Sequence, residues 1–296
     1  MNLKIFITGA NGFIARNVIE QLSSKYNLVV PSHKELNLLD TSAVDKFFLR
    51  HKHFDVILHT AIVGGNRKVP NTPEIATVNL RMFFNVARNI KYFGRMIHLG
   101  SGIEYGKERA LKKVKETDFD KYVPQNNFGF YKYLCGKFIE NSQKIFNLRL
   151  FGVFGKYEDS SIRFISNAIC KSILGIPITI NQNVYFDYLY VDDFVQILDY
   201  FLTHKAQYKS YNVGTGKSTD LLSIANKINN IAEHKVSVKI RSRGMANEYT
   251  CNNNRLIGEI GSFKFTNLDQ ALKELHQWYL SQKSKLKVRN FLHNHF

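Results

Sequence analysis

Thr8-Gly9-Ala10-Asn11-Gly12-Phe13-Ile14-Ala15 joins an apolar segment at residues 3–8 to a helical pattern over residues 14–24. Glycines at positions 9 and 12 permit a tight turn and let a pyrophosphate approach the backbone, while the small Ala15 allows close helix–strand packing. The free N–H groups at the start of a helix favour phosphate. The stretch therefore predicts a dinucleotide site, with an ordinary glycine-rich turn as the alternative.

Short apolar runs alternate with helical stretches across the first half of the chain. We expect strands at residues 28–31, 56–60, 96–100 and 148–151, and helices at residues 43–51, 75–93 and 129–146. Strands that alternate with helices imply an α/β fold with a Rossmann-type, doubly wound parallel sheet. Right-handed crossovers then bring the carboxyl ends of the strands to one edge, where ligands bind.

The alternation loosens after residue 155, where short strand patterns at 178–180 and 236–240 mix with helical patterns at 191–203, 220–231 and 268–280. We therefore predict a dinucleotide-binding domain over residues 1–155. Residues 156–280 are expected to form mainly a smaller α/β substrate lobe, with some segments returning to the sheet. Residues 281–296 are expected to form a basic, solvated and mobile tail.

Composition narrows the class of protein. The 296 residues are 44% hydrophobic, which suffices for a large core, and no apolar run reaches the roughly 20 residues of a membrane span. The net charge of +17 is spread along the chain, so we interpret it as favouring an anionic ligand, with no nucleic acid partner and no stable membrane association. Cys135, Cys170 and Cys251 lack metal or disulfide spacing, so we expect a cytoplasmic protein without metal.

Several further segments carry a resemblance to a known family. They are residues 34–40 (Lys-Glu-Leu-Asn-Leu-Leu-Asp), 56–65 (Val-Ile-Leu-His-Thr-Ala-Ile-Val-Gly-Gly), 188–193 (Tyr-Leu-Tyr-Val-Asp-Asp) and 211–216 (Tyr-Asn-Val-Gly-Thr-Gly). Together with the glycine-rich turn, they resemble the extended short-chain dehydrogenase/reductase family of NAD-dependent epimerases and dehydratases. Within that family the resemblance is strongest to nucleotide-sugar C4 reductases of the GDP-L-fucose synthase type.

The segment after the second strand bears on the choice between NADP(H) and NAD(H). It reads Ser32-His33-Lys34, without the carboxylate that would accept from a ribose 2′-OH. Basic residues there favour a 2′-phosphate, so we expect NADP(H), with NAD(H) less favoured and plain surface charges as the alternative. The turn and the resemblance together imply cofactor contacts from Thr8, Gly9, Asn11, Gly12, Phe13, Ile14, Ser32, His33, Lys34, Leu39, Asp40, His59, Thr60, Ala61, Asn79 and Lys132.

The reaction centre of the resembled family contains a serine, a tyrosine that donates a proton, and a lysine that lowers the tyrosine pKa and holds the nicotinamide ribose. Ser101 matches the serine. Tyr133 with Lys137 and Phe128 with Lys132 are two competing registers for the other pair. The family frame of a proline followed by Tyr-Gly-x-x-Lys favours the second, because it also matches Pro124, Gly129, Lys132 and Leu134. We therefore predict a catalytic set of Ser101, Phe128 and Lys132.

Phe128 removes the proton donor from that set. Tyr131 lies about 5 Å further along the helix, beyond the roughly 2.6–3.2 Å that proton donation requires. Two interpretations follow: an engineered Tyr-to-Phe variant that traps its substrate, or a natural relative that has lost this chemistry. We favour the inactivated variant, because the rest of the predicted site is intact.

The resemblance also narrows the reaction. Family members that epimerise their keto sugar have a cysteine and a histidine where this chain has Ile103 and Arg163, and neither replacement can exchange protons. Gly102-Ile103 likewise replaces the Asp-Glu pair of the dehydratases. We expect NADPH-dependent C4 reduction of a nucleotide-diphospho-4-keto sugar, with a GDP-linked deoxy sugar as the first candidate, without 3,5-epimerisation. The alternatives are an NAD-dependent nucleotide-sugar C4 epimerase and a non-catalytic NADP(H)-binding protein.

Substrate contacts and assembly are expected from the resemblance alone. Phe186 stands where the family has an arginine for the diphosphate, so the nucleotide base stays open, and Tyr185 and Phe186 either stack on it or belong to the core. A homodimer is expected through the helices at 75–93 and 129–146. The predicted substrate-binding residues are Val63, Gly64, Ser101, Gly102, Arg163, Phe164, Tyr185 and Phe186.

A Phe128→Tyr variant is expected to turn over the keto sugar faster by roughly 10²–10⁴-fold, the usual contribution of a positioned general acid. The measurement is the steady-state rate of NADPH oxidation in the variant and the parent chain. An unchanged rate would contradict the assignment of Phe128 and Lys132 to the reaction centre.

Overall fold

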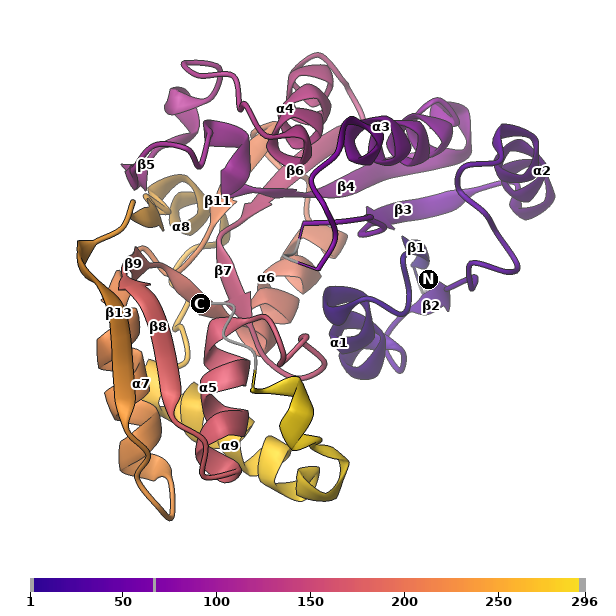
Figure 1. Ribbon diagram of the computed structural model, residues 1–296. Helices are drawn as coiled ribbons and strands as arrows, with labels where there is room; N and C mark the ends of the chain where they lie inside the picture. Colours follow the sequence, from indigo (N-terminus) through magenta and orange to yellow (C-terminus); the bar gives the residue numbers. More distant parts are fainter. Residues whose placement is uncertain (1–2, 66–67, 293–296) are drawn as a thin grey trace.

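A parallel central sheet organises the N-terminal part of the protein. The computed structural model describes residues 3–65 and 68–292, and within them the sheet has six strands in the order β2-β1-β3-β4-β6-β11, every pair parallel. The predicted doubly wound parallel sheet is confirmed (Figure 1). The strands are β1 Lys4–Thr8, β2 Asn27–Val29, β3 Phe54–His59, β4 Phe93–Ser101, β6 Ile145–Leu150 and β11 Ser210–Val213.

Helices cover both faces of this sheet, because successive side chains of a strand point to opposite faces. On β1, Phe6 belongs to one core cluster and Ile5 and Ile7 to another, all at most 1% exposed. The Phe6 face lies under α2 Thr41–His51, α3 Pro73–Ala87 and α4 Asn127–Glu140. The other face is covered by α1 Phe13–Leu22 and α6 Val191–Thr203.

Two helices end earlier than the sequence predicts. The helix expected over 75–93 ends at Ala87, and Phe93 already begins β4, opposite Phe54. The helix expected over 129–146 begins two residues early, where the Asn126 side chain accepts from the Gly129 N–H at 2.7 Å, and it ends at Glu140. In both cases the prediction extended the helix across a short, largely polar connection (residues 88–92 and 141–144), because polar residues also suit the exposed face of a helix.

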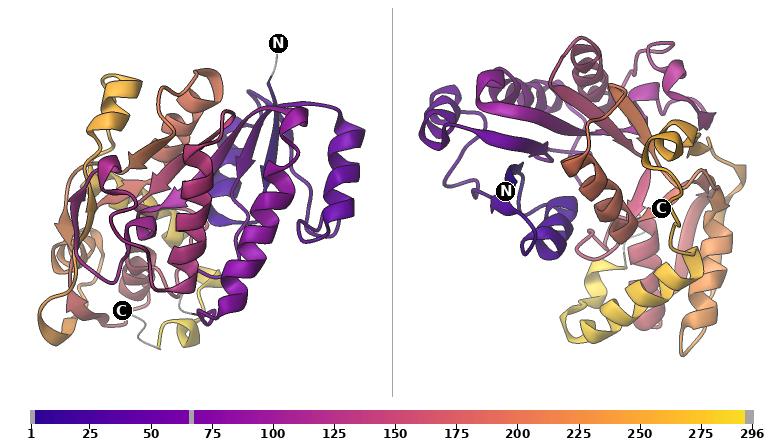
Figure 2. Two further views of the ribbon diagram at one scale, coloured as in Figure 1. Left: turned by 90° about the horizontal axis from the view of Figure 1, so that it is seen from above. Right: turned by 180° about the vertical axis from the view of Figure 1, so that it is seen from behind.

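A smaller lobe is formed by elements that follow β6 in the sequence. β8 Ile178–Asn183 pairs in parallel with β13 Val238–Met245, and α5 Phe164–Ile173, α7 Leu221–Ile231 and α9 Leu268–Ser281 share one hydrophobic core. Figure 2 shows this lobe beside the sheet from two further sides. α6 and β11 return to the sheet, and α8 Asn254–Ile260 packs near β11. The domain limits at residues 155 and 280 stay a prediction.

A small mixed sheet links the two parts, and the sequence analysis did not anticipate it. Its strand order is β12-β9-β14-β5. Nearby, β7 Gly152–Phe154 pairs with β10 Tyr188–Tyr190. The strands of the small sheet are β5 Leu111–Val114, β9 Tyr185–Phe186, β12 Thr219–Asp220 and β14 Tyr249–Cys251. The sheet carries β14 to the carboxyl end of β4.

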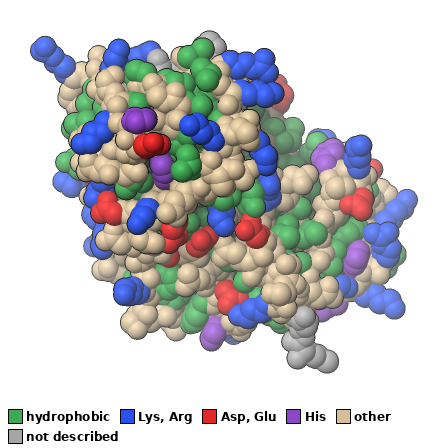
Figure 3. Space-filling view, turned by 90° about the horizontal axis from the view of Figure 1, so that it is seen from below, with side chains coloured by type: hydrophobic (Ala, Val, Ile, Leu, Met, Phe, Trp, Pro, Cys, Tyr) green, Lys and Arg blue, Asp and Glu red, His purple; other side chains and the backbone are tan. Residues whose placement is uncertain are grey.

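The basic tail differs from its prediction. Lys283–Lys285 and Val288–Asn290 form short 3-10 turns, and Phe291 is only 2% exposed within the core of the lobe. An aromatic anchor therefore holds a segment that its charge suggested was solvated and mobile; residues 293–296 of the predicted tail lie outside the described residues. Figure 3 shows Lys and Arg side chains scattered over one face rather than gathered in a band.

Among the residues that the structure describes, no helix combines the length and the apolar character needed to cross a lipid bilayer.

A buried ion pair fixes the end of β4. Glu104, in the 3-10 turn Gly102–Tyr105, accepts from Arg149 Nε of β6 at 2.7 Å, and the side chains are 0% and 1% exposed. The same carboxylate accepts from the Ser101 N–H at 2.9 Å and from Asn147 Nδ2 at 2.9 Å. A buried carboxylate needs such partners, because it has lost its hydration.

An Arg149→Met variant is expected to lose about 3–5 kcal/mol of unfolding free energy, because the change leaves the Glu104 carboxylate buried without its cation. Urea denaturation of the variant and the parent chain measures the loss. Lys137→Met is the control: Lys137 bridges Asp120 at 2.7 Å with both side chains well exposed, and such pairs contribute roughly 0–1 kcal/mol. Equal losses in the two variants would contradict this role of the buried pair.

Candidate active site

The glycine-rich turn lies where the strand order reverses, between β1 and β3. Gly9 has φ +68°, and a Cβ there would lie 2.8 Å from Ala61 Cα. The Gly12 N–H donates to Gly9 O at 2.9 Å, and α1 begins after Gly12 without a side-chain cap. The first N–H groups of the helix thus remain for a ligand, and the turn fits the pyrophosphate of a dinucleotide.

Two threonines join the ends of β1 and β3 beside this turn. Thr8 Oγ1 accepts from the N–H groups of Thr60 and Ala61, each at 3.1 Å, and Thr60 Oγ1 donates to Thr8 O at 2.5 Å. His59 Nδ1 lies 3.1 Å from Thr8 Oγ1. Burial, aided by the nearby Lys132 charge, lowers the pKa of His59 to about 3. His59 therefore stays neutral, and its hydrogen bond to Thr8 helps to fix the threonine beside the glycine-rich turn.

Asn79 holds the loop after β3 rather than facing the cleft. Its side chain is 1% exposed. The amide oxygen accepts from Val63 N at 2.8 Å, and the amide nitrogen donates to Val63 O at 2.8 Å and to Ile75 O at 2.7 Å. With these bonds made, its predicted contribution to cofactor binding is indirect, through the shape of the loop that carries exposed Val63 and Gly64 at φ +83°.

The basic residues after β2 are accessible. His33 and Lys34 are exposed, while the Glu35 carboxylate accepts from the Ser32 N–H at 2.7 Å, a bond that lowers the pKa of Glu35. Glu35, the one acidic residue of this turn, therefore bonds to the backbone of the turn itself. Further along, the Asp40 carboxylate caps α2 by accepting from Ala43 N at 2.9 Å, beside the partly buried Leu39.

Lys132 projects from α4 to the same edge of the sheet. It is 4% exposed, and its ammonium donates to the carbonyl of Leu99, two residues before Ser101. Burial lowers the pKa of Lys132 to about 8. Burial and this cation also hold the pKa of His98 well below its ordinary value. The structure thus puts one buried ammonium beside the serine that ends β4.

The side chains of the competing register, Tyr133 and Lys137, both bind Asp120. The Tyr133 hydroxyl donates to the Asp120 carboxylate, and Lys137 Nζ meets the same carboxylate at 2.7 Å, outside the strand edge. The Tyr131 ring lies in the core under α4, where its hydroxyl has no hydrogen-bond partner among the described residues. The geometry therefore favours Phe128 and Lys132 over Tyr133 and Lys137, and it gives Tyr131 no access to the cleft.

Phe128 faces the loop after β3. A Cβ on Gly65, which has φ +75°, would lie 2.4 Å from Phe128 Cζ, so this ring needs a glycine opposite it. The exposed Arg163, at the start of α5, donates from Nη2 to Gly65 O at 3.3 Å. Gly65, Phe128 and Arg163 thus meet where the sheet edge faces the lobe. Gly65 belongs to the motif at residues 56–65, but no role for it was predicted from the sequence.

Ser101 has a partner that sequence reasoning missed. Its Oγ lies 3.2 Å from the hydroxyl of Tyr249, a residue 148 positions away on β14. Gly102 provides the room, because a Cβ there would lie 2.7 Å from Tyr249 Oη. No local pattern marks Tyr249, since its place depends on the pairing of β14 with β5 and β9.

The aromatic residues predicted to contact the substrate differ in their exposure. Tyr185 is 42% exposed, while the Phe186 ring packs 5.6 Å from Tyr249 and 5.4 Å from Tyr188, centroid to centroid. Phe164 is 7% exposed in the core of the lobe. Of the two residues left open between stacking and core, Phe186 is packed and Tyr185 keeps a free face, while Phe164, predicted to bind substrate, lies in the core of the lobe.

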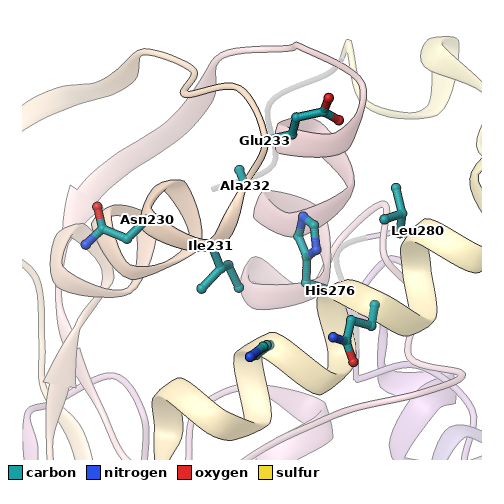
Figure 4. Close-up of a pocket in the computed structure, with 8 residues that line it drawn as sticks. Asn230, Ile231, Ala232, Glu233, His276 and Leu280 are labelled. Atoms are coloured by element: carbon teal, nitrogen blue, oxygen red, sulfur yellow. The ribbon is translucent and has the colours of Figure 1, made fainter.

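A separate concavity lies between the end of α7 and the side of α9 (Figure 4). None of the residues predicted for the site lines it. Its lining comprises Asn230, Ile231, Ala232, Glu233, Lys273, His276, Gln277 and Leu280.

A phosphate-binding turn at the sheet switch point, next to a serine and a buried lysine on adjoining elements, is the arrangement of a short-chain dehydrogenase/reductase. Residues 5–214 match the model for the NAD dependent epimerase/dehydratase family, and the chain belongs to this family.

Named relatives of this chain act on nucleotide sugars. GDP-L-colitose synthase of Yersinia pseudotuberculosis is 23% identical over 309 residues, covering 95% of this chain and 99% of that protein. A GDP-mannoheptose C4 reductase from Campylobacter jejuni, solved with NADP bound, has a TM-score of 0.81 at 20% identity, covering 94% and 98% of the two chains. UDP-glucose 4-epimerase of Thermotoga maritima, solved with UDP-glucose, gives 0.81 at 20%, covering 95% and 99%. The two structures establish the shared fold.

The depressed pKa of Lys132 makes folding stability depend on pH. The pKa falls from 10.5 to about 8, so between these values the unfolded chain binds more protons and the contribution of Lys132 to stability rises with pH. That contribution is lost as the pH falls through 8. The stability of a Lys132→Met variant relative to the parent chain should therefore be most favourable near neutral pH and decline as the pH is raised.

Urea unfolding of both proteins at several pH values from about 7 to about 10 measures this difference. Every other titrating group is shared, so the pair isolates Lys132. A difference that does not change with pH would contradict the burial of the ammonium.

Proposed function

We propose that this protein reduces the C4 carbonyl of a nucleotide-diphospho-4-keto sugar with NADPH, without epimerising the sugar. The observation that carries the proposal is the convergence of Ser101 and the buried Lys132 ammonium at the end of β4, beside the Gly9 turn. The names of the relatives add the substrate class. A GDP-linked deoxy sugar is the first candidate, because the names of two relatives, GDP-L-colitose synthase and GDP-mannoheptose C4 reductase, both refer to GDP-linked sugars.

The residues present fit a nicotinamide dinucleotide. The Gly9–Gly12 turn and the start of α1 would hold its pyrophosphate, His33 and Lys34 a 2′-phosphate, and Lys132 the nicotinamide ribose. When bound, the reduced nucleotide supplies a hydride. Ser101 Oγ would hydrogen-bond the carbonyl oxygen and orient it, while the lobe excludes water from the reacting carbon.

The absence of epimerase chemistry rests on two residues. Ile103 follows Ser101 at the position of a proton-carrying cysteine in the resembled enzymes, and an isoleucine side chain has no proton to exchange. Arg163 replaces the second proton carrier, and its guanidinium donates to Gly65 O. Arginine keeps its proton, so it can bind a phosphate or a sugar oxygen but cannot act as a base.

Phe128 supports lowered activity in this chain. Its phenyl ring meets the Gly65 loop and carries no hydroxyl, at the position where the resembled family has a tyrosine. Because Phe128 cannot donate a proton, a non-catalytic NADP(H)-binding protein is one alternative that has to be tested. A C4 epimerase is the other alternative, and the fold shared with UDP-glucose 4-epimerase is its support.

An exposed aromatic pair supports the proposed homodimer. Phe84 on α3 and Phe138 on α4 are 39% and 41% exposed, with ring centroids 5.1 Å apart and nearly perpendicular planes. Two adjacent helices with apolar side chains in solvent suit a self-complementary interface.

The function is tested with NADPH, NADH and nucleotide sugars linked to GDP, UDP, CDP or dTDP. We expect NADPH to raise the melting temperature more than NADH, and a GDP sugar to raise it further, because ligands that bind the native state stabilise it. GDP-4-keto-6-deoxymannose should then be reduced at C4, with NADPH consumed in equal amount. Retention of NAD through repeated C4 inversion would instead identify an epimerase, and indifference to every sugar a non-catalytic binder.

A paired His33→Ala/Lys34→Ala variant serves as the control for cofactor choice. It should lose most of the extra stabilisation by NADPH and keep that by NADH, because only the former carries the 2′-phosphate. Lys235→Ala, an exposed lysine between α7 and β13, should change neither. A preference for NADPH that survives the paired change would contradict the proposed phosphate site.

A further inference from the structure

A reductase of this type needs a proton for the carbonyl oxygen, and position 128 cannot supply one. Three nearby tyrosines have hydroxyls that are either bonded to other side chains or enclosed in the core. Tyr105 Oη donates to Asn212 Oδ1 at 2.7 Å, Tyr133 Oη donates to Asp120, and Tyr131 is enclosed in the core under α4. Tyr249 differs from these three, because its hydroxyl reaches the side chain of Ser101.

Tyr249 is held firmly at the end of β4. Its backbone pairs with β5 at Leu111 and with β9 at Phe186. Its ring packs against Phe151 and Phe186, with centroids 5.0 and 5.6 Å away. The residue is 8% exposed, so rotation of the ring would displace packed neighbours. The hydroxyl is therefore directed at Ser101 by the packing of the small sheet.

Gly102 is the second observation that connects Tyr249 with the reaction centre. A Cβ at this position would lie 2.7 Å from Tyr249 Oη and 2.6 Å from Phe151 Cε1. Any side chain there would force the tyrosine away from Ser101. The turn after β4 thus has the shape that admits a hydroxyl from the C-terminal half of the chain.

We propose that Tyr249 is the proton donor to the carbonyl oxygen that Ser101 holds. The assignment rests on the proposed reductase function. Two hydroxyl oxygens 3.2 Å apart can both hydrogen-bond one carbonyl oxygen placed between and in front of them, which is the reach that general acid catalysis requires. The donor then comes from β14 instead of α4.

The step balances with NADPH as the reductant. The carbonyl carbon accepts a hydride from the reduced nicotinamide, and the C=O π electrons move to oxygen. That oxygen takes the Tyr249 proton as the O–H bond of the tyrosine breaks. The products are the C4 alcohol, NADP⁺ and a tyrosinate, and the tyrosinate regains a proton from water.

The surroundings of Tyr249 make it a usable but weak acid. Burial raises the pKa of Tyr249, so the hydroxyl stays protonated at neutral pH, and the Arg163 charge acts in the opposite direction. The Lys107 ammonium lies 5.7 Å from the ring centroid. A forming alkoxide is a stronger base than a phenolate, so transfer to the carbonyl oxygen remains favourable. Lys132 assists position 128 rather than Tyr249, so a tyrosine restored at 128 still accelerates the reaction.

The primary test is single-turnover oxidation of NADPH by saturating GDP-4-keto-6-deoxymannose in Tyr249→Phe and the parent chain. We expect the rate to fall by at least tenfold, since general acids contribute roughly 10²–10⁴. Tyr133→Phe is the matched control: it removes the same atom from a tyrosine bonded to Asp120, and its rate should stay unchanged. The dissociation constant of the sugar should stay within about threefold in both, which a collapsed site would not allow.

A double-mutant cycle with Phe128→Tyr separates donation from packing. In the Phe128→Tyr background the loss of the Tyr249 hydroxyl should cost less than about threefold, because the restored tyrosine donates instead. A packing role would cost the same factor in both backgrounds. Equal factors, or no loss in Tyr249→Phe alone, would overturn the proposal while leaving the reductase function standing. No NADPH oxidation in any variant, Phe128→Tyr included, would refute the function and this assignment together.

Discussion

The buried contact between Glu104 and Arg149 is the constraint on which the end of β4 depends. Both groups have left solvent, so each must be satisfied by neighbours in fixed directions. The carboxylate accepts hydrogen bonds from Arg149 Nε, Asn147 Nδ2 and the Ser101 N–H, which ties the serine at the end of β4 to the neighbouring strand β6. The polar chain continues through Tyr105 to Asn212 of β11. A site built on such a network is positioned before any ligand arrives, which is what orientation of a reacting carbonyl requires.

The proposed reaction centre draws its groups from the sheet and from the segments that follow it. The sheet edge contributes the phosphate turn, the serine and the buried ammonium. The C-terminal half contributes Arg163, which reaches Gly65, and Tyr249, which reaches Ser101. A substrate between these groups would contact both halves, so binding of the nucleotide sugar and assembly of the reaction centre are linked.

The parts that sequence could predict are those that local pattern determines. The glycine turn identified the sheet, and the proline-to-lysine frame selected Lys132, whose neighbours differ clearly from those of Lys137. The ends of two helices were predicted too late, beyond Ala87 and Glu140, because the largely polar connections that follow them also suit the exposed face of a helix. The tail was predicted to be solvated because of its charge, and no local pattern marks the burial of Phe291 within it. Tyr249 was out of reach for a different reason: its position follows from strand pairing across 148 residues, which no short window of sequence contains.

The proposed role of Lys132 links cofactor binding to the protonation of its side chain. Its ammonium is enclosed, with Leu99 O as an acceptor and two imidazoles kept neutral nearby. The low pKa expresses the cost of that enclosure. If the nicotinamide ribose meets the ammonium as proposed, its hydroxyls would give further acceptors and lessen the cost, so binding of the nucleotide would raise the lysine pKa. By linkage, protonation of Lys132 must then tighten nucleotide binding by the same factor. On this proposal the lysine contributes to nucleotide binding without a tyrosine at position 128.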